Sequence, residues 1–364
     1  MLKSLHIENL TVFPNAELKF GKNLNIIIGE NGSGKSHLLK TVYCALAVSA
    51  EGKKGTAQGV PARDFLAKAF ADKLRGVFRP DTLGRLARRT QGHTTCRLEY
   101  HFKQEALDFS VQFSTRTKAE VVVDKSPSAW LEKKPVFLPT RELLSIYPGF
   151  SSLYKETHLP FEETWNDTCL LLGAPLARGP REPRIKYLLR PLESAMGGNV
   201  ELDKSGRFYL NTNTGSMEMH LVAEGLRKLA MVARLIATGS LLDKGYLFWD
   251  EPESNLNPKI IKTIARSILE LAHKGIQVFI ASHSLFLLRE LHILQHSPGF
   301  QGLDTRCFGL HLESCGKVII QQGRTMDDVG EIAALDEDLQ QSERYIDNEM
   351  GVPDQAAGSD SSKA

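Results

Sequence analysis

The feature that most constrains this chain is the glycine-rich segment GENGSGKS at residues 29–36. It matches the pattern G-x-x-x-x-G-K-S, in which glycines allow backbone amides to turn inward around phosphate groups. An apolar strand is predicted at residues 24–28 and a helix from residue 35 to about residue 48. This order places the positive end of a helix dipole at the phosphates. The segment therefore predicts a phosphate-binding loop, with an ordinary glycine turn as the alternative.

Each residue of this loop has an expected role. We expect Lys35 to contact the β- and γ-phosphates of ATP and the Ser36 hydroxyl to bind Mg²⁺. The remaining contacts to the nucleotide are expected from the loop and the first helical turn. The complete predicted set is Gly29, Asn31, Gly32, Ser33, Gly34, Lys35, Ser36 and His37.

A second apolar run, YLFWDE at residues 246–251, ends in two carboxylates. Asp250 follows Lys35 by 215 positions (250 − 35) and is expected to bind Mg²⁺, directly or through water. Glu251 is expected to polarise the attacking water. The sequence IASHS places His283 at the end of the next predicted strand, where a γ-phosphate would lie. The predicted catalytic residues are Glu251, His283 and Lys35; a solvated strand end and a structural histidine are the alternatives.

Short apolar runs alternate with helical patterns near both ends of the chain, beginning with residues 5–7 and 23–28. This alternation indicates an α/β fold with a mainly parallel sheet flanked by helices. Three β-like runs with short connections predict an antiparallel β subdomain at residues 94–123. The predicted units are a first ATPase lobe at 1–141 with a helical insertion at 51–93, a mainly helical insertion at 142–215, a second lobe at 216–325, an acidic C-terminal helix at 326–350 and a disordered tail at 351–364.

The composition is that of an average soluble protein, with 42% hydrophobic and 24% charged residues and a net charge of +2. The N-terminus does not resemble a signal peptide, and no apolar run is long enough to span a bilayer. The five cysteines are scattered and lack C-x-x-C spacing, so we expect free thiols in a reducing compartment. These features predict a cytoplasmic protein with no membrane partner.

Several segments together resemble a known family. DEPESNLNP at residues 250–258 resembles the Walker B motif and D-loop of ABC-type ATPases, and GENGSGKS and IASHS suit the same family. The segments IENLTVFPNAELKF, VFLPTREL and EIAALDEDLQQSERYI are similar to the SMC/RecF-like branch, especially the short standalone AAA-family ATPases of bacterial anti-phage defence modules. The resemblance covers both ends and most of the core, but not residues 51–93 or 142–215. It implies an ABC-type head that binds and hydrolyses ATP with Mg²⁺.

In that family two heads sandwich two ATP molecules, and the signature helix of each head reaches the γ-phosphate held by the other. The matching stretch here is LVAEGLRKLAM at residues 221–231. The resemblance implies that nucleotide is also contacted by Ala223, Glu224, Gly225 and the D-loop residue Asn255, with Ala223 in place of the usual serine. The family's lobe-connecting glutamine is not evident, and PTREL at residues 139–143 lies at its expected place. A simple amphipathic helix is the alternative for 221–231.

Two biological roles remain open at this stage. The first is a regulatory ATPase of a defence module that controls a separate effector such as a nuclease, since the chain has no convincing nuclease site of its own. The second is a RecF-like repair or replication ATPase that clamps DNA. Residues 51–93 hold ten Lys and Arg against four acids and could contact DNA or RNA, or form solvated helix faces. A transporter subunit and a non-hydrolysing binding module are disfavoured, because a coupling segment is not evident and Lys35, Asp250, Glu251 and His283 are all present.

Overall fold

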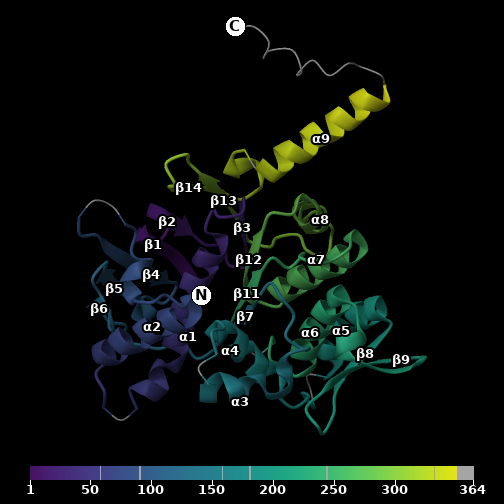
Figure 1. The fold of residues 1–364 in the computed structure, drawn as a ribbon, viewed down its shortest axis with the longest axis horizontal. Coiled ribbons are helices and arrows are strands. Elements are labelled where there is room, and N and C mark those ends of the chain that lie inside the picture. Colours follow the sequence, from purple (N-terminus) through teal and green to yellow (C-terminus); the bar gives the residue numbers. More distant parts are fainter. Residues whose placement is uncertain are drawn as a thin grey trace, which may run out of the picture.

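The computed structural model describes residues 1–57, 59–89, 92–157, 159–179, 182–242, 245–331 and 333–350. The predicted tail at 351–364 lies outside the described residues. A six-stranded sheet forms the centre of the molecule (Figure 1). Its order is β14 (Val318–Gly323), β13 (Thr305–Leu312), β3 (Leu24–Gly29), β12 (Gln277–Ser282), β11 (Tyr246–Asp250) and β7 (Pro135–Leu138). All neighbours are parallel except β13 and β14, so the predicted α/β fold with a mainly parallel sheet is confirmed.

The middle strands of this sheet are continuous apolar runs because helices cover both faces. Every residue of β11 and β12 is buried, as are the first five residues of β3. The registers pair Ile28 with Ser282 and Asp250 with Ala281. The carboxyl ends of β3, β11 and β12 therefore meet at one edge of the sheet, where ligands bind in open α/β sheets.

A second sheet is antiparallel, with the order β2 (Phe13–Lys19), β1 (Leu2–Leu10), β4 (Thr95–Phe102), β5 (Phe109–Ser114) and β6 (Val122–Lys125). The last three strands correspond to the predicted β subdomain. Grouping the first apolar run, residues 5–7, with the parallel sheet was wrong. This run belongs to β1, whose buried residues Leu5, Ile7 and Leu10 are separated by partly exposed ones, the pattern of a strand covered on one face.

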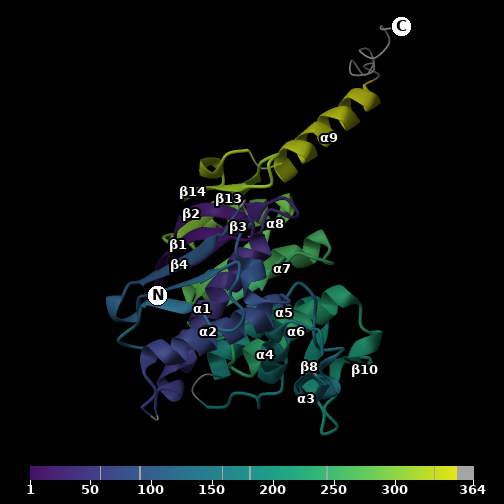
Figure 2. The same ribbon diagram turned by 60° about the vertical axis from the view of Figure 1, so that its left-hand side comes forward.

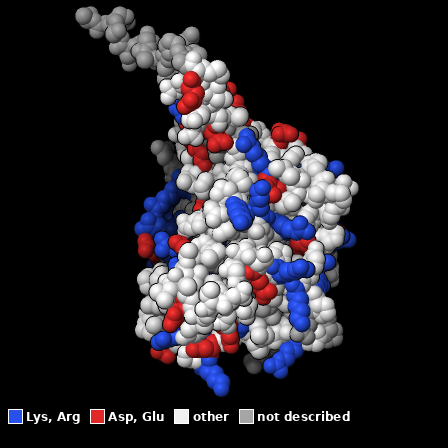
Figure 3. Space-filling view, turned by 90° about the vertical axis from the view of Figure 1, so that its right-hand side faces the viewer, with Lys and Arg blue, Asp and Glu red and all other residues white. Residues whose placement is uncertain are grey.

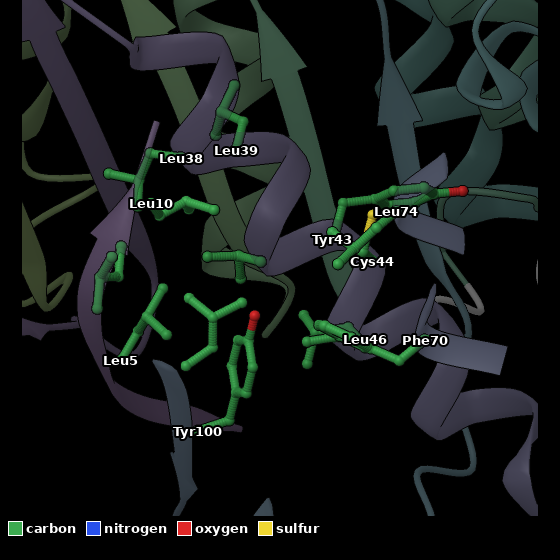
Figure 4. Close-up of a cluster of buried hydrophobic side chains, with 14 of the residues drawn as sticks. Leu5, Leu10, Leu38, Leu39, Tyr43, Cys44, Leu46, Phe70, Leu74 and Tyr100 are labelled. Atoms are coloured by element: carbon green, nitrogen blue, oxygen red, sulfur yellow. The ribbon is translucent and has the colours of Figure 1, made fainter. Parts of the chain in front are cut away.

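Two hydrophobic cores lie on opposite faces of the central sheet. The first is filled by α1 (Lys35–Gly55) and α2 (Ala62–Phe78), which pack against the antiparallel sheet. Figure 4 shows Leu38 of α1 beside Leu10 of β1, and Leu46 of α1 beside Phe70 of α2, in this core. The second core contains α6 (Glu224–Ala237), α7 (Pro258–His273) and α8 (Leu285–Gln295). Figure 2 shows these helices on the side of the sheet away from the antiparallel strands.

The insertion at 142–215 contains α3 (Tyr147–Thr157), α4 (Glu163–Leu172) and α5 (Glu182–Met196). Its last part differs from the predicted helical structure. There, β8 (Gly198–Leu202), β9 (Phe208–Thr212) and β10 (Gly215–Glu218) form a three-stranded antiparallel sheet. The reversal after β8 is stabilised by Asp203, whose carboxylate accepts from the amides of Ser205 and Arg207. Short 3₁₀ helices η1 (Leu83–Leu86), η2 (Glu105–Leu107), η3 (Met219–Leu221) and η4 (Asp327–Val329) connect other elements.

The acidic C-terminal helix begins later than predicted. Residues 327–329 form η4, and α9 (Ala333–Glu349) follows Gly330, whose φ of 73° interrupts any helix that starts at residue 326. The helix projects from the body and carries acidic side chains, while Lys and Arg gather on the body below it (Figure 3). Within the part of the chain that the structure describes, no helix is both long and apolar enough to cross a membrane.

Candidate nucleotide site

The phosphate-binding loop joins β3 to α1 at the carboxyl edge of the central sheet. Gly32 and Gly34 have φ angles of 85° and 89°, which glycine adopts without the cost that a side chain would bring. Helix α1 begins at Lys35, and no side chain caps its first turn. The free amides of that turn are therefore available to an anion. Asn31 and Gly32 are exposed, whereas Ser33 is buried and donates to the Glu30 carbonyl at 2.8 Å.

Lys35 is folded onto the loop that it follows. Its Nζ donates to the carbonyl oxygens of Gly29 and Glu30, at 2.8 Å each, and the residue is only 6% exposed. Burial lowers the pKa of Lys35, although Glu251 and Asp250 oppose the shift. The ammonium thus lies within the field of the two carboxylates at the end of β11. Both of these acceptors are neutral carbonyls, which a phosphate oxygen can replace as a stronger, charged acceptor.

Asp250 and Ser36 come together as a pair suited to a divalent cation. The Asp250 carboxylate is 7% exposed, and burial raises its pKa while the nearby Ser36 hydroxyl opposes that shift. Its Oδ1 has no hydrogen-bond partner. A buried carboxylate oxygen without a partner fits Mg²⁺, which commonly binds through one or two protein oxygens and completes its shell with substrate phosphates and water. The described residues contain no cluster of three or more His, Cys, Asp or Glu that could hold a metal.

Glu251 and His283 face each other across the ends of β11 and β12. The Nδ1 atom of His283 lies 3.3 Å from Oε1 of Glu251, without the geometry of a hydrogen bond. The Glu251 side chain is 25% exposed and that of His283 is 43% exposed. Glu251 has a φ of 46°, an unfavourable backbone angle for a residue with a side chain. Its amide donates to the Ala281 carbonyl at 2.9 Å, which ties the turn after β11 to β12.

The segment corresponding to the signature motif lies against the D-loop. Ala223 precedes the first residue of α6, and both Ala223 and Glu224 are exposed. The Glu224 carboxylate accepts from Nδ2 of Asn255 at 2.9 Å, and a Cβ on Gly225 would lie 2.9 Å from the Asn255 carbonyl oxygen. Across the described ranges, no hydrogen bond or ion pair joins Ala223, Glu224 or Gly225 to the phosphate-binding loop. Within one chain, the predicted site residues therefore form two separate groups. One surrounds the phosphate-binding loop, and the other lies at the start of α6 and in the D-loop.

His37 lies beside the phosphate-binding loop but turns toward the β1–β2 connection. Its Nδ1 is 3.2 Å from the Thr11 hydroxyl, and its ring packs 5.5 Å from that of Phe78. Burial and the neighbouring Lys40 lower the pKa of His37. Its predicted contact with nucleotide stays a prediction.

Three buried charged residues support this site, although no role was predicted for them from the sequence. Glu142, in the PTREL segment, accepts from Nε of Arg227 on α6 at 2.7 Å. Lys228, also on α6, donates to the Glu251 carbonyl at 2.7 Å. Glu253 accepts from the Ser282 hydroxyl at 2.6 Å, and burial raises its pKa. The only sequence signal for them was the presence of charges inside otherwise apolar or motif segments, which does not reveal partners that lie far away in the chain.

Comparisons with known proteins agree with this architecture. A family model described as "AAA domain" matches residues 4–125, and one described as "AAA domain, putative AbiEii toxin, Type IV TA system" matches residues 112–289. The DNA replication and repair protein RecF of Clostridium acetobutylicum is 37% identical over 49 residues. That match spans 13% of this chain and only 14% of the RecF sequence.

Among solved structures, the chain is similar to an Smc head bound to the C-terminal winged-helix domain of ScpA, with a TM-score of 0.53 and 11% identity over 90% of this chain and 98% of that one. It is also similar to an Smc head with an extended coiled coil, bound to the C-terminal domain of ScpA derived from Pyrococcus furiosus. That likeness has a TM-score of 0.50 and 10% identity over 95% of this chain and 99% of the other.

The fold and the geometry of the loop define the chain as a P-loop ATPase head. The family models and the RecF match narrow the class of ATPase further. These findings support an ABC-type ATPase of the SMC/RecF-like branch that resembles the short ATPases of defence modules.

Proposed function

We propose that the chain binds ATP with Mg²⁺ and hydrolyses it. The observation that carries this proposal is the buried Oδ1 atom of Asp250, which has no hydrogen-bond partner among the described residues and belongs to a carboxylate near the Ser36 hydroxyl. These two residues would hold Mg²⁺, which when bound neutralises charge on the β- and γ-phosphate oxygens. Lys35 and the amides at the start of α1 would bind the phosphates. The predicted contacts of Asn31, Gly32, Ser33 and Gly34 would follow from the loop backbone.

In this proposal Glu251 orients and deprotonates the attacking water, and His283 contacts the γ-phosphate. Their side chains are partly exposed and lie 3.3 Å apart, so both can reach one small substrate group. General-base catalysis of this kind contributes about 10²- to 10⁴-fold to a rate. The two residues come from adjacent strand ends, and the amide of Glu251 donates to the Ala281 carbonyl near the end of β12.

We further propose that ATP closes a head-to-head dimer. Ala223, Glu224 and Gly225 lie at the start of α6, where an anion binds favourably. Ala223 and Glu224 are exposed, as is the D-loop residue Asn255, which donates to the Glu224 carboxylate. In the dimer they would contact the nucleotide held by the partner's phosphate-binding loop. Hydrolysis would then release the two heads.

As a biological role we propose regulation of a separate effector in a bacterial defence system, in the cytoplasm. The support is the family model named after a toxin, and the compact insertion at 142–215, which consists of short helices and a small sheet rather than a tethering coiled coil. The alternative is a RecF-like DNA clamp, supported by the short RecF match. The basic segment at 51–93 gives the alternative limited support, because part of its charge is used inside the fold. Lys73 forms two ion pairs with α4, and Arg88 donates to the Val12 carbonyl.

The direct test compares wild-type protein with Glu251→Gln. We expect Mg²⁺-dependent phosphate release to fall by about 10²-fold or more in the variant. We also expect the variant to increase in molar mass by light scattering when ATP and Mg²⁺ are added. The matched control is the double variant Lys35→Ala/Glu251→Gln, which keeps the glutamine but weakens phosphate binding and should not associate. A wild-type protein with no Mg²⁺-dependent turnover would contradict the proposed ATPase.

The biological role is tested by purifying tagged Glu251→Gln protein from its native cells at moderate salt. A stoichiometric protein with a nuclease or toxin-like site, identified by mass spectrometry, would support the regulatory role. Nuclease-sensitive nucleic acid without a protein partner would support the clamp and overturn the regulatory proposal. Neutralising the exposed Lys53, Lys54 and Lys68 would then show whether that segment binds it.

A further inference from the structure

Lys228 is a buried ammonium group in the second turn of the signature helix α6. The residue is 2% exposed. Its Nζ donates to the Glu251 carbonyl at 2.7 Å, to the Ser254 hydroxyl at 2.5 Å and to the Ser254 carbonyl at 3.3 Å. All three of its donors are thus used, and all three acceptors belong to the turn that follows β11.

The turn that Lys228 holds contains a strained residue. Glu251 combines a positive φ of 46° with a side chain, a conformation that costs of order 1–3 kcal/mol and persists only where its surroundings enforce it. The amide of Glu251 is bound by the Ala281 carbonyl on β12, and its carbonyl is bound by Lys228. Both backbone polar groups of the residue are therefore fixed. Because they fix the direction of the Cα–Cβ bond, they also direct the carboxylate toward His283.

The same amine connects this turn to the segment proposed to bind a partner's nucleotide. Lys228 is three residues after Gly225 on one continuous helix, which rises about 1.5 Å per residue. At Gly225 the helix lies so close to the D-loop that an added Cβ would come within 2.9 Å of the Asn255 carbonyl. A displacement of the start of α6 would therefore be transmitted to Lys228 and to the Glu251 carbonyl.

A purely structural role for Lys228 would be costly. Burial lowers the pKa of this amine to about 8, which reflects the penalty for keeping its charge away from water. An apolar side chain of similar length would pack α6 at less cost, whereas the ammonium satisfies three oxygens of one turn at once. The hydrogen bonds of Lys228 therefore indicate that it holds the turn after β11, and not that it serves to pack α6.

We propose that Lys228 is a positioning residue, which holds the strained Glu251 turn in its hydrolytic geometry and couples it to the signature helix. This inference rests on the proposed ATPase function and adds a route by which ATP contact at α6 controls hydrolysis. Lys228 itself touches neither the phosphates nor the water. Its contribution should therefore appear in the rate of the chemical step and not in the affinity for ATP.

The test is the variant Lys228→Met in the full chain, with Lys262→Met as the matched control because Lys262 is exposed on α7. Steady-state phosphate release gives kcat and KM, and a fluorescent ATP analogue gives affinity in the presence of Mg²⁺. We expect Lys228→Met to lower kcat by about 10- to 100-fold, since a misplacement of about 1 Å can cost about 10²-fold. ATP affinity should stay within threefold of the wild type. A kcat within threefold of the wild type would overturn the proposal.

Two further variants keep the test decisive. Adding Lys228→Met to Glu251→Gln should cause little further loss of residual hydrolysis, because the residue positioned is already inactive, whereas independent effects would multiply. If Lys228→Met does not fold, Ser254→Ala removes one of the three acceptors, and kcat should fall while affinity is kept. Parallel losses of affinity and rate in Ser254→Ala would overturn the proposal. A wild type without hydrolysis would instead refute the ATPase function itself.

Discussion

Two glycines of the phosphate-binding loop allow a controlled test of its geometry. Gly32 and Gly34 have nearly equal φ angles, 85° and 89°, but their surroundings differ. A Cβ at Gly32 would have nothing within 4 Å, whereas a Cβ at Gly34 would lie 2.7 Å from Val12 Cγ2 and 2.9 Å from Phe13 Cζ. Phe13 is fully buried and cannot move without disturbing the first core. Gly32→Ala and Gly34→Ala both place a side chain in a strained backbone conformation, but only Gly34→Ala also overpacks the contact with Val12 and Phe13.

The expected losses of unfolding free energy follow from the backbone strain and the overpacking. A side chain in the left-handed region costs about 1–2 kcal/mol, which is the full expected loss of unfolding free energy for Gly32→Ala. Overpacking adds about 1–3 kcal/mol, so Gly34→Ala should lose about 2–5 kcal/mol. Urea unfolding followed by circular dichroism measures both, with equal m values as the requirement for comparing them. Equal losses in the two variants, within about 0.5 kcal/mol, would refute the assignment of Gly34 as a packing glycine.

Two further predictions concern stability and thiol chemistry. Lys73→Met should lower the free energy of unfolding by about 2–4 kcal/mol, because it removes the cation from two carboxylates of α4, each held at 2.8 Å and less than a third exposed. The control is Lys53→Met, on the exposed end of α1, and a loss under about 0.5 kcal/mol in Lys73→Met would contradict the argument. At pH 7 to 9, native protein should react with a thiol reagent rapidly only at Cys315, because burial raises the pKa of Cys169 and Cys307 to about 12 and the other cysteines are buried too. Cys315→Ser should abolish the fast phase, and all five thiols should react in urea.

Much of the central architecture could be predicted from the sequence because it depends on local patterns. The glycine spacing of 29–36 and the apolar runs of β3, β11 and β12 each occupy a few consecutive residues. Their chemistry then follows from the rule that parallel strand ends meet at one edge. The later start of α9 at residue 333 was not predicted, because Gly330 can occur inside a helical pattern or end it.

The support of the site could not be predicted because its contacts join distant parts of the chain. The Arg227–Glu142 ion pair spans 85 positions, and the sequence alone does not distinguish Arg227 from an exposed arginine on an amphipathic helix. The same holds for Glu253, whose D-loop position suggests exposure although its carboxylate is buried against Ser282. The basic segment at 51–93 shows that net charge does not reveal which charged side chains are exposed. Its net charge suggested a surface for nucleic acid, yet Lys73 is only 11% exposed and neutralised by α4.

The contacts of Lys35 suggest how binding of ATP would begin. Its ammonium is bound to two carbonyl oxygens of its own loop, both at 2.8 Å. A neutral carbonyl pair holds a buried cation less strongly than a phosphate does. Exchange of these acceptors for phosphate oxygens would therefore be favourable, and the negative charge of the phosphate would offset the effect of burial, which lowers the pKa of Lys35. To bind ATP in this way, the Lys35 side chain would turn from the Gly29 and Glu30 carbonyls toward the phosphates.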